Sequence, residues 1–324
     1  MSDFQFLQNP ISKIWVVLAP RRSKRPDISR EQNFVCPFCP GNEAMEKEAF
    51  RIPSSSSVIP SSSSVIPGSS SVIPGSDPGS TQIDSRFLGN DYSSNWEVRV
   101  LTNKFPFAPI HEIIIHSPDH HKNFDELPIM QVEKILWVYR QRFQVHQAQG
   151  NPYIFNNHGQ AGGESIPHPH TQLVVIPQEV HAQIQPLVQE EESYEAKYFH
   201  LFCPSTSQWP DEVWVAPKRK DTNFGEIEDE ELSDLAIILQ RLIQLFTMRH
   251  GHEFAFNFYI YPGKNWYLRF MPRTKSLGGF EIGTGVFVNT QDPKETLRFI
   301  KSNFENKEIT ELEEENKADF AMGV

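Results

Sequence analysis

Two histidines, His168 and His170, stand two residues apart directly after a glycine-rich loop at 157–166. Pro167 and Pro169 keep this stretch out of a helix and bias it toward extended backbone, in which residues two apart project from the same face. The loop's amides are suited to cradling a phosphate, and a neutral imidazole acts as nucleophile, base or metal ligand near neutral pH. The pattern indicates one of these chemistries beside a phosphate. From the local pattern alone, a merely metal-binding or solvated histidine pair is an equal alternative.

Cys36 and Cys39 form a C-x-x-C pair in a chain with one other cysteine, Cys203. Three cysteines in 324 residues do not indicate a secreted disulfide scaffold. A thioredoxin-type redox pair opens a helix, whereas this pair lies in a proline-rich loop, so the sequence favours a metal knuckle. A closed zinc site needs four ligands, and His120 and His168 are the best placed to complete it.

Motifs along the chain resemble the galactose-1-phosphate uridylyltransferase family, a branch of the histidine-triad superfamily. The likeness rests mainly on the stretches 36–42, 117–120 and 168–172. It continues at 15–26, 102–106, 212–219 and 278–285. The cysteine knuckle and the His-Pro-His-x-Gln stretch in this order form a specific combination.

The resemblance implies a two-step nucleotidyl transfer. His170 would attack the α-phosphorus of a nucleoside diphosphate sugar, displace the sugar 1-phosphate and pass the nucleotide to a second phosphate acceptor. Gln172 matches a catalytic donor to the phosphates. The resemblance assigns the remaining substrate contacts to Arg22, Arg25, Asn103, Asn157, Gly163, Ser165 and Glu281. Glu281 matches a residue that contacts sugar hydroxyls.

The same resemblance implies one structural zinc ion, held by Cys36, Cys39, His120 and His168. With all four positions filled by protein, the metal would fix the strand that presents the nucleophile. His121 is the rival of His120 as fourth ligand, and spacing alone leaves both open.

A second metal site that members of this family often carry is expected to be absent. Its positions read His200, Cys203, Lys220 and Asn265 here, and an ammonium group cannot ligate.

His111 and His116 lie on an apolar strand, and we interpret them as ordinary packed or surface histidines.

The resemblance implies an α+β fold of two histidine-triad-like halves, each an antiparallel sheet with a long helix. Hydrophobic periodicity supports a repeated order of strands and helices. For the first half, the pattern predicts strands at 97–101, 112–116, 153–156 and 170–177 and a helix at about 126–149. For the second half, it predicts strands at 212–216, 254–261 and 265–272, a helix at about 229–249 and a final helix at about 293–304. Aligning 170–177 with 265–272 puts Asn265 at the place of His170, so the second half is expected to lack the nucleophile.

We expect a catalytic half at 1–183 and a C-terminal half at 184–324. Three near-identical Ser-Val-Ile-Pro repeats at 54–74 indicate a flexible insertion at about 52–94, because such a composition buries too little apolar surface to become ordered. A glutamate-rich tail is expected at about 305–324.

The net charge of −11 argues against a nucleic-acid partner, and no apolar run is long enough to span a membrane, so cytoplasmic localisation is expected. The leading hypothesis is a homodimeric UDP-glucose–hexose-1-phosphate uridylyltransferase of galactose metabolism, with a nucleotide sugar and a sugar phosphate as partners. One alternative is an ADP-glucose phosphorylase-like adenylyltransferase that uses phosphate as acceptor. It is suggested by Trp266-Tyr267 and the stretch 278–285. The other alternative is a non-catalytic nucleotide-binding protein.

Overall fold

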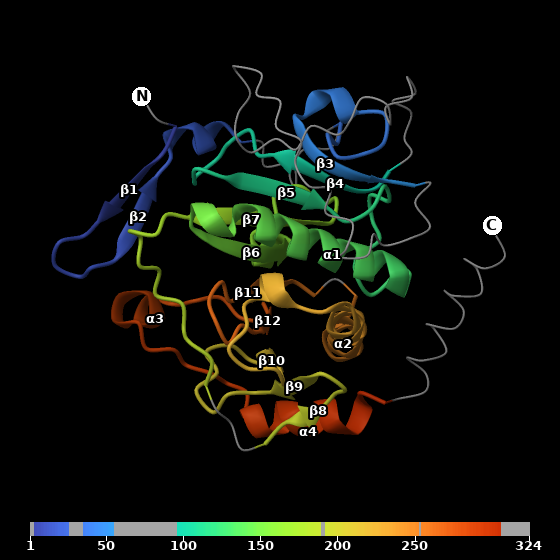
Figure 1. Cartoon of the computed structure of the whole chain (residues 1–324). Coiled ribbons are helices and arrows are strands. Elements are labelled where there is room, and N and C mark those ends of the chain that lie inside the picture. Colours follow the sequence, from blue (N-terminus) through green and yellow to red (C-terminus); the bar gives the residue numbers. More distant parts are fainter. Residues whose placement is uncertain (1–2, 26–34, 55–95, 189–191, 253, 306–324) are drawn as a thin grey trace.

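One antiparallel sheet of ten strands, in the order β3-β4-β5-β7-β6-β11-β12-β10-β9-β8, runs through the molecule (Figure 1). This computed structural model describes residues 3–25, 35–54, 96–188, 192–252 and 254–305. The strands of the first half are β3 (Glu48–Pro53), β4 (Trp96–Thr102), β5 (His111–Ile115), β6 (Asn151–His158) and β7 (His170–Ile176). Those of the second half are β8 (Tyr194–Glu195), β9 (Phe199–Phe202), β10 (Val213–Pro217), β11 (Phe256–Ile260) and β12 (Leu268–Pro272).

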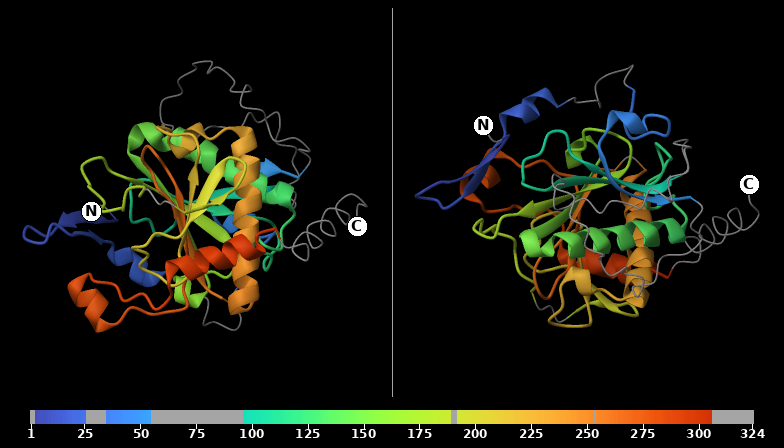
Figure 2. Two further views of the ribbon diagram at one scale, coloured as in Figure 1. Left: turned by 90° about the horizontal axis from the view of Figure 1, so that it is seen from below. Right: turned by 45° about the horizontal axis from the view of Figure 1, so that its top comes forward.

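Two long helices, α1 (Ile129–His146) and α2 (Asp229–His250), pack against each other on one face of this sheet (Figure 2). Successive side chains of a strand point to opposite faces of the sheet, so only alternate residues contact the two helices. In β7, Leu173 and Val175 join the main core beneath the helices, whereas His170 and Gln172 point to the opposite, open face. Apolar side chains thus attach the strand to the core on one face, and the polar side chains of His170 and Gln172 lie on the other face.

The smaller elements lie around this body. A hairpin of β1 (Gln5–Gln8) and β2 (Trp15–Leu18) projects from the N-terminal side (Figure 1). Two further helices are α3 (Gly279–Thr284) and α4 (Pro293–Asn303). Short 3-10 turns occupy Pro20–Lys24, Glu43–Met45, Gln147–Gln149, Gln160–Gly162 and Phe224–Glu226.

The strand order repeats in the two halves of the chain. β3-β4-β5-β7-β6 is matched by β8-β9-β10-β12-β11, and each half places its long helix between its third and fourth strands. The predicted α+β class is confirmed. Each half contributes five antiparallel strands and a long helix, and the two sets of strands form one continuous sheet, because β6 pairs directly with β11 and brings Asn157 opposite Asn257. The division at residues 183 and 184 stays a prediction.

Several predicted boundaries shift for local reasons. The first helix begins at Ile129 rather than near Glu126, because Pro128 occupies its N-cap. The second-half strand predicted from Asn265 begins at Leu268. Asn265 instead adopts left-handed backbone, with φ of 55°, and its Oδ1 accepts a hydrogen bond from the backbone N–H of Asp221. Strand boundaries therefore do not support the alignment of Asn265 with His170.

The sequence interpretation did not include β3, β8, β9, the β1–β2 hairpin or α3. Ile52 and Pro53 belong to β3, so the predicted insertion starts later than expected, and its remainder from residue 55 lies outside the described residues. The predicted acidic tail lies outside them as well, apart from Glu305. Within the described ranges, no helix combines the length and the apolar character needed to cross a membrane.

A buried ion cluster ties α1 to the sheet next to β7. Glu112 of β5 accepts hydrogen bonds from Arg142 Nε at 2.9 Å and Nη2 at 2.5 Å, and its Oε1 lies 3.0 Å from Nε2 of His146. Burial would raise the pKa of Glu112, but the hydrogen bonds from His146 and Arg142 hold it below its usual value.

Replacing Glu112→Gln is expected to lower the free energy of unfolding by about 3 kcal/mol, because it leaves the buried Arg142 guanidinium uncompensated. Urea denaturation followed by circular dichroism measures this change. Glu133→Gln on the same helix is the matched control, because among the described residues Glu133 has no ion-pair partner. An equal, small effect of both substitutions would contradict the anchoring role of Glu112.

Candidate active site and metal centre

His170 opens strand β7 as a buried, neutral imidazole. Its Nδ1 lies 2.9 Å from the carbonyl oxygen of His168. Burial lowers the pKa of His170 to about 4, so the ring is uncharged at neutral pH. Since a carbonyl can only accept, Nδ1 carries the proton and Nε2 keeps a free lone pair. Phe38 packs edge-on against the ring, with 5.3 Å between centroids. The ring is thus held in one tautomer, with Nε2 unprotonated.

A buried hydrogen-bond network fixes the helix side of the same strand. Tyr139 of α1 places its hydroxyl 2.5 Å from Oγ1 of Thr171, and Nε2 of His116 lies 2.8 Å from that oxygen. Asn156 Nδ2 donates to the carbonyl of His170 at 2.9 Å and to Oγ1 of Thr171 at 3.1 Å. His116 is thus packed, as interpreted, but it also anchors the nucleophile's strand.

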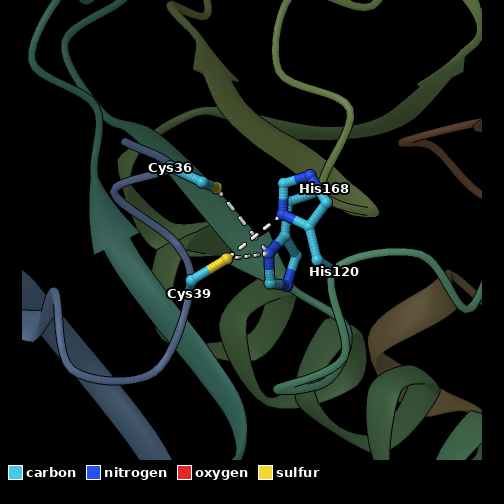
Figure 3. A group of neighbouring side chains, drawn as sticks. All are labelled: Cys36, Cys39, His120 and His168. Carbon is cyan, nitrogen blue, oxygen red and sulfur yellow. Dashed lines mark hydrogen bonds between the residues drawn. The ribbon is translucent and has the colours of Figure 1, made fainter. Parts of the chain in front are cut away.

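Four predicted ligands converge beside this strand, namely Cys36, Cys39, His120 and His168 (Figure 3). Their ligand atoms all lie within 4.8 Å of one another. The Sγ–Nδ1 distances are 3.1 Å for Cys39–His120, 3.6 Å for Cys39–His168 and 3.8 Å for Cys36–His168. These three distances lie near the edges of about 3.3–3.8 Å of a tetrahedron with ordinary zinc bond lengths, and thiolate and imidazole are donors that zinc accepts.

The surroundings orient these ligands. Nε2 of His168 lies 2.8 Å from the carbonyl of Ser117, which leaves Nδ1 to face the cysteines. Asn42 Nδ2 donates to the carbonyl of Cys36 at 2.8 Å and ties the knuckle together. The neighbouring His121 is not part of the cluster and lines a different cavity. Of the two histidines left open by spacing, the structure therefore brings His120 to the cysteines.

The predicted phosphate loop folds over the end of β6 and β7. Gly163 adopts φ of 83°, which favours glycine. A Cβ on Gly162 would lie 2.9 Å from the carbonyl oxygen of Phe256, so this position admits no side chain without a shift. After the turn, Ser165 Oγ accepts a hydrogen bond from the Arg25 guanidinium. Asn157 stands on the open face at the start of the loop, in the strand that pairs with β7.

The other predicted arginine is anchored near the loop that follows β4. Arg22 donates from Nη1 to the carbonyl of Phe105 at 2.7 Å and stacks over the Phe107 ring at 4.8 Å. Burial lowers the pKa of Arg22, which still leaves a cation at neutral pH.

His111 is a residue that the sequence interpretation undervalued. Its Nε2 lies 3.0 Å from Oε1 of Gln172 and 3.0 Å from Nδ2 of Asn103. Burial lowers the pKa of His111 to about 4, so the ring is neutral, and Nε2 either donates to Gln172 or accepts from Asn103. Two predicted site residues thus share one imidazole nitrogen. His111 opens β5, where it is paired with Val174 of β7, and Gln172 is paired with Ile113 two residues along the strand. No signal in the sequence shows this contact, because it follows from the β5–β7 register.

Glu281 is held apart from this constellation. It lies in α3, where Oε1 accepts from Lys275 Nζ at 3.0 Å and Oε2 accepts from the backbone N–H of Gly278 at 3.1 Å. Within the described part of the chain, it makes no hydrogen bond or ion pair with the other predicted site residues.

The sequence of this chain is similar to those of known proteins. The family model "Galactose-1-phosphate uridyl transferase, N-terminal domain" matches residues 110–184. The chain is 22% identical to the ADP-glucose phosphorylase of Arabidopsis thaliana, over 91% of this chain and 91% of that protein. It is also 22% identical to the galactose-1-phosphate uridylyltransferase of Thermotoga maritima, over 90% of this chain and 96% of that protein.

A solved structure shares the fold. The crystal structure of the Arabidopsis thaliana ADP-glucose phosphorylase with bound ADP-glucose superposes with a TM-score of 0.61 at 22% identity. The match covers 92% of this chain and 98% of that one.

The metal centre yields a direct prediction. Elemental analysis is expected to find one zinc ion per chain, and Cys39→Ser is expected to lose it and to lower the melting temperature, because metal binding contributes to folding free energy. Cys203→Ser is the matched control, since Cys203 is buried in the main core and outside the cluster. Full zinc content in Cys39→Ser would contradict the assignment of this ligand.

Glu164 in the loop yields a pH-dependent prediction. Its side chain is 10% exposed, and burial raises the pKa of Glu164 to about 7, although it accepts a hydrogen bond from the Gly159 N–H. A raised folded-state pKa gives stability that is complete below about pH 4.5 and is lost as the pH rises through about 7.

Glu164→Gln, which stays neutral, is therefore expected to be more stable than the wild type at pH 8 by about 2 kcal/mol, with the difference vanishing near pH 4. Chemical denaturation across this range measures it. Glu126→Gln, an exposed carboxylate on the same cavity, should show no such trend. A pH-independent difference for Glu164→Gln would refute the buried, proton-binding state.

Proposed function

Because the chain belongs to the galactose-1-phosphate uridylyltransferase family and is a nucleotidyltransferase, we propose that it transfers a nucleotidyl group from a nucleoside diphosphate hexose through His170. The acceptor is a second phosphate compound. The observation that carries this proposal is the buried neutral ring of His170, whose Nδ1–H is bound to a carbonyl and whose Nε2 is therefore free to attack.

The chemistry balances in two substitutions. In the first, the Nε2 lone pair forms a bond to the α-phosphorus, and the bond from phosphorus to the bridging oxygen breaks, so the sugar 1-phosphate leaves with the electron pair. In the second, an oxygen of the acceptor phosphate attacks the same phosphorus, and the N–P bond returns its pair to Nε2. Splitting one hard substitution into two easier ones is the advantage of a good nucleophile that is also a good leaving group.

Donors surround the place where phosphoryl charge accumulates. Asn157 and Gln172 are the predicted amide donors, and Ser165 lies on the loop with the Arg25 guanidinium beside it. Fixed donors of this kind stabilise a transition state by about 3 kcal/mol each in a site that excludes water.

The proposed metal site would hold His170 in position. Cys36, Cys39, His120 and His168 would hold a zinc ion, whose chemistry is structural because protein fills all four positions. His168 also supplies the carbonyl that binds Nδ1 of His170. Fixing His168 as a metal ligand would therefore also fix the imidazole of His170.

We propose UDP-glucose as the donor and a hexose 1-phosphate as the acceptor, as in galactose metabolism. Similarity to the Thermotoga maritima uridylyltransferase over nearly the whole of both chains supports this choice. An adenylyl transfer from ADP-glucose to phosphate is the second candidate, which the Arabidopsis thaliana relative and its ADP-glucose complex favour.

A homodimer is part of the proposal. Apolar side chains are exposed on the projecting hairpin region, with Ile11 at 91%, and on α3, with Ile282 at 72%. Burying such side chains against a second copy would remove apolar surface from water.

One labelling experiment tests the function. Incubation with UDP-glucose or ADP-glucose labelled at the α-phosphate, followed by a quench in base, is expected to leave label on the wild type from one donor, which names the nucleotide. His170→Ala should retain none. His181→Ala, an exposed histidine outside the site, should retain as much as the wild type. Label on His170→Ala, or no label on the wild type from either donor, would refute the proposal.

A further inference from the structure

A side chain of the second half reaches the catalytic face through two hydrogen bonds. Arg273 follows β12, and its Nη1 donates to Oδ1 of Asn257 at 2.6 Å. Asn257 in β11 then donates from Nδ2 to Oδ1 of Asn157 at 2.9 Å and to the carbonyl of Gly162 at 2.7 Å. This series of hydrogen bonds crosses from β11 to β6, where the two halves of the sheet join.

The groups at the two ends of this series of hydrogen bonds determine which way the Asn257 amide points. A guanidinium has only donors, so Asn257 must turn its carbonyl oxygen toward Arg273. The opposite side of the Asn257 amide faces the carbonyls of Gly162 and Asn156, which only accept, so the NH₂ group must lie there. Arg273 on one side and the two carbonyls on the other require the same orientation. The positions of the oxygen and the nitrogen of the Asn257 amide are therefore determined by its neighbours.

The imposed polarity passes to Asn157. Because Asn257 donates, Asn157 must present its oxygen to β11, and its own NH₂ group turns the other way. Among the residues that the structure describes, that NH₂ group has no hydrogen-bond partner. The β6–β7 register pairs Asn156 with Thr171, which makes Asn157 the cross-strand neighbour of His170. Such neighbours have Cβ atoms about 5 Å apart.

We propose that Arg273 and Asn257 are positioning residues that hold the Asn157 amide with its NH₂ group toward the phosphate attacked by His170. The inference rests on the proposed nucleotidyl transfer. An amide in the reverse orientation would aim a carbonyl oxygen at a phosphoryl oxygen and repel the transition state. A residue pair of the second half thereby sets the orientation of a donor in the first half.

The packing of Arg273 suits a fixed support. Its guanidinium stacks over the Trp209 ring at 4.2 Å, and its Nε is buried without a partner in the described structure. Stacking and the bond to Asn257 restrict the side chain, so little conformational entropy remains to be lost when a nucleotide binds.

Asn257→Asp tests the relay with almost no change in shape. An aspartate still accepts from Arg273, but it cannot donate, so the Asn157 amide must rotate and turn its oxygen toward the phosphate. The rate of covalent nucleotidyl-enzyme formation, measured by rapid quench with the donor that labels the wild type, is expected to fall about 100-fold. Asn303→Asp, which removes a comparable donor to the carbonyl of Phe299 in α4, should change the rate less than about twofold.

A double-mutant cycle separates the relay from simple charge repulsion. If Asn257 acts through Asn157, adding Asn257→Asp to Asn157→Ala should change the rate less than about threefold. Arg273→Met should likewise slow the wild type and have little effect in the Asn157→Ala background, and it serves if Asn257→Asp fails to fold. Full effects of both substitutions in that background would overturn the relay, because each residue would then act on the phosphate directly.

The outcomes distinguish this inference from the proposed function. If the wild type forms no nucleotidyl-enzyme, the proposed function fails. If the wild type reacts and a folded, zinc-loaded Asn257→Asp reacts at the same rate, only the relay fails.

Discussion

The double role of His168 is the constraint on which the site depends. Its imidazole joins the Cys36–Cys39 knuckle, and its backbone carbonyl accepts the Nδ1–H of His170 at 2.9 Å. A single residue therefore couples the Cys36–Cys39–His120–His168 cluster to the tautomer of His170. Strand β7 adds a second hold, because Thr171 is bound on the helix side by Tyr139 while His170 faces the open side. His170 is thus held through its Nδ1–H and its neighbour Thr171, and Nε2 takes no part in holding it.

The continuous sheet brings side chains of both halves to the same face. Pairing of β6 with β11 places Asn257 opposite Asn157, so polar groups of the two halves meet on one open face. The buried Glu112–Arg142 pair holds the long helix on the other face and keeps β5 in place beside β7. In the proposed function, the first half supplies the reacting groups and the second half supports one of them.

The sequence predicts those parts of this molecule whose chemistry demands particular residue types. Zinc accepts few kinds of ligand, so Cys36, Cys39, His120 and His168 are recognisable although 132 residues separate the first from the last. Spacing could not choose between His120 and His121, because only the fold decides which ring turns to the cysteines. Long periodic helices were found, with errors at caps such as Pro128.

Features that depend on pairing between distant strands could not be predicted. His111, Asn257 and Arg273 carry no motif. The contact of His111 with Gln172 depends on the register of β5 with β7, and the contact of Asn257 with Asn157 depends on that of β6 with β11. Short strands such as β8 lack enough residues to show a period. Asn265 was misplaced because its local hydrogen bond with Asp221 outweighed the apolar pattern that follows it.

Nitrogen-15 NMR of the zinc-loaded protein, labelled at histidine and assigned by difference against His170→Gln, tests the central claim most directly. At pH 7 the account predicts a neutral His170 ring with the proton on Nδ1 and none on Nε2. A ring protonated on Nε2, alone or together with Nδ1, would leave no lone pair for attack and would contradict it.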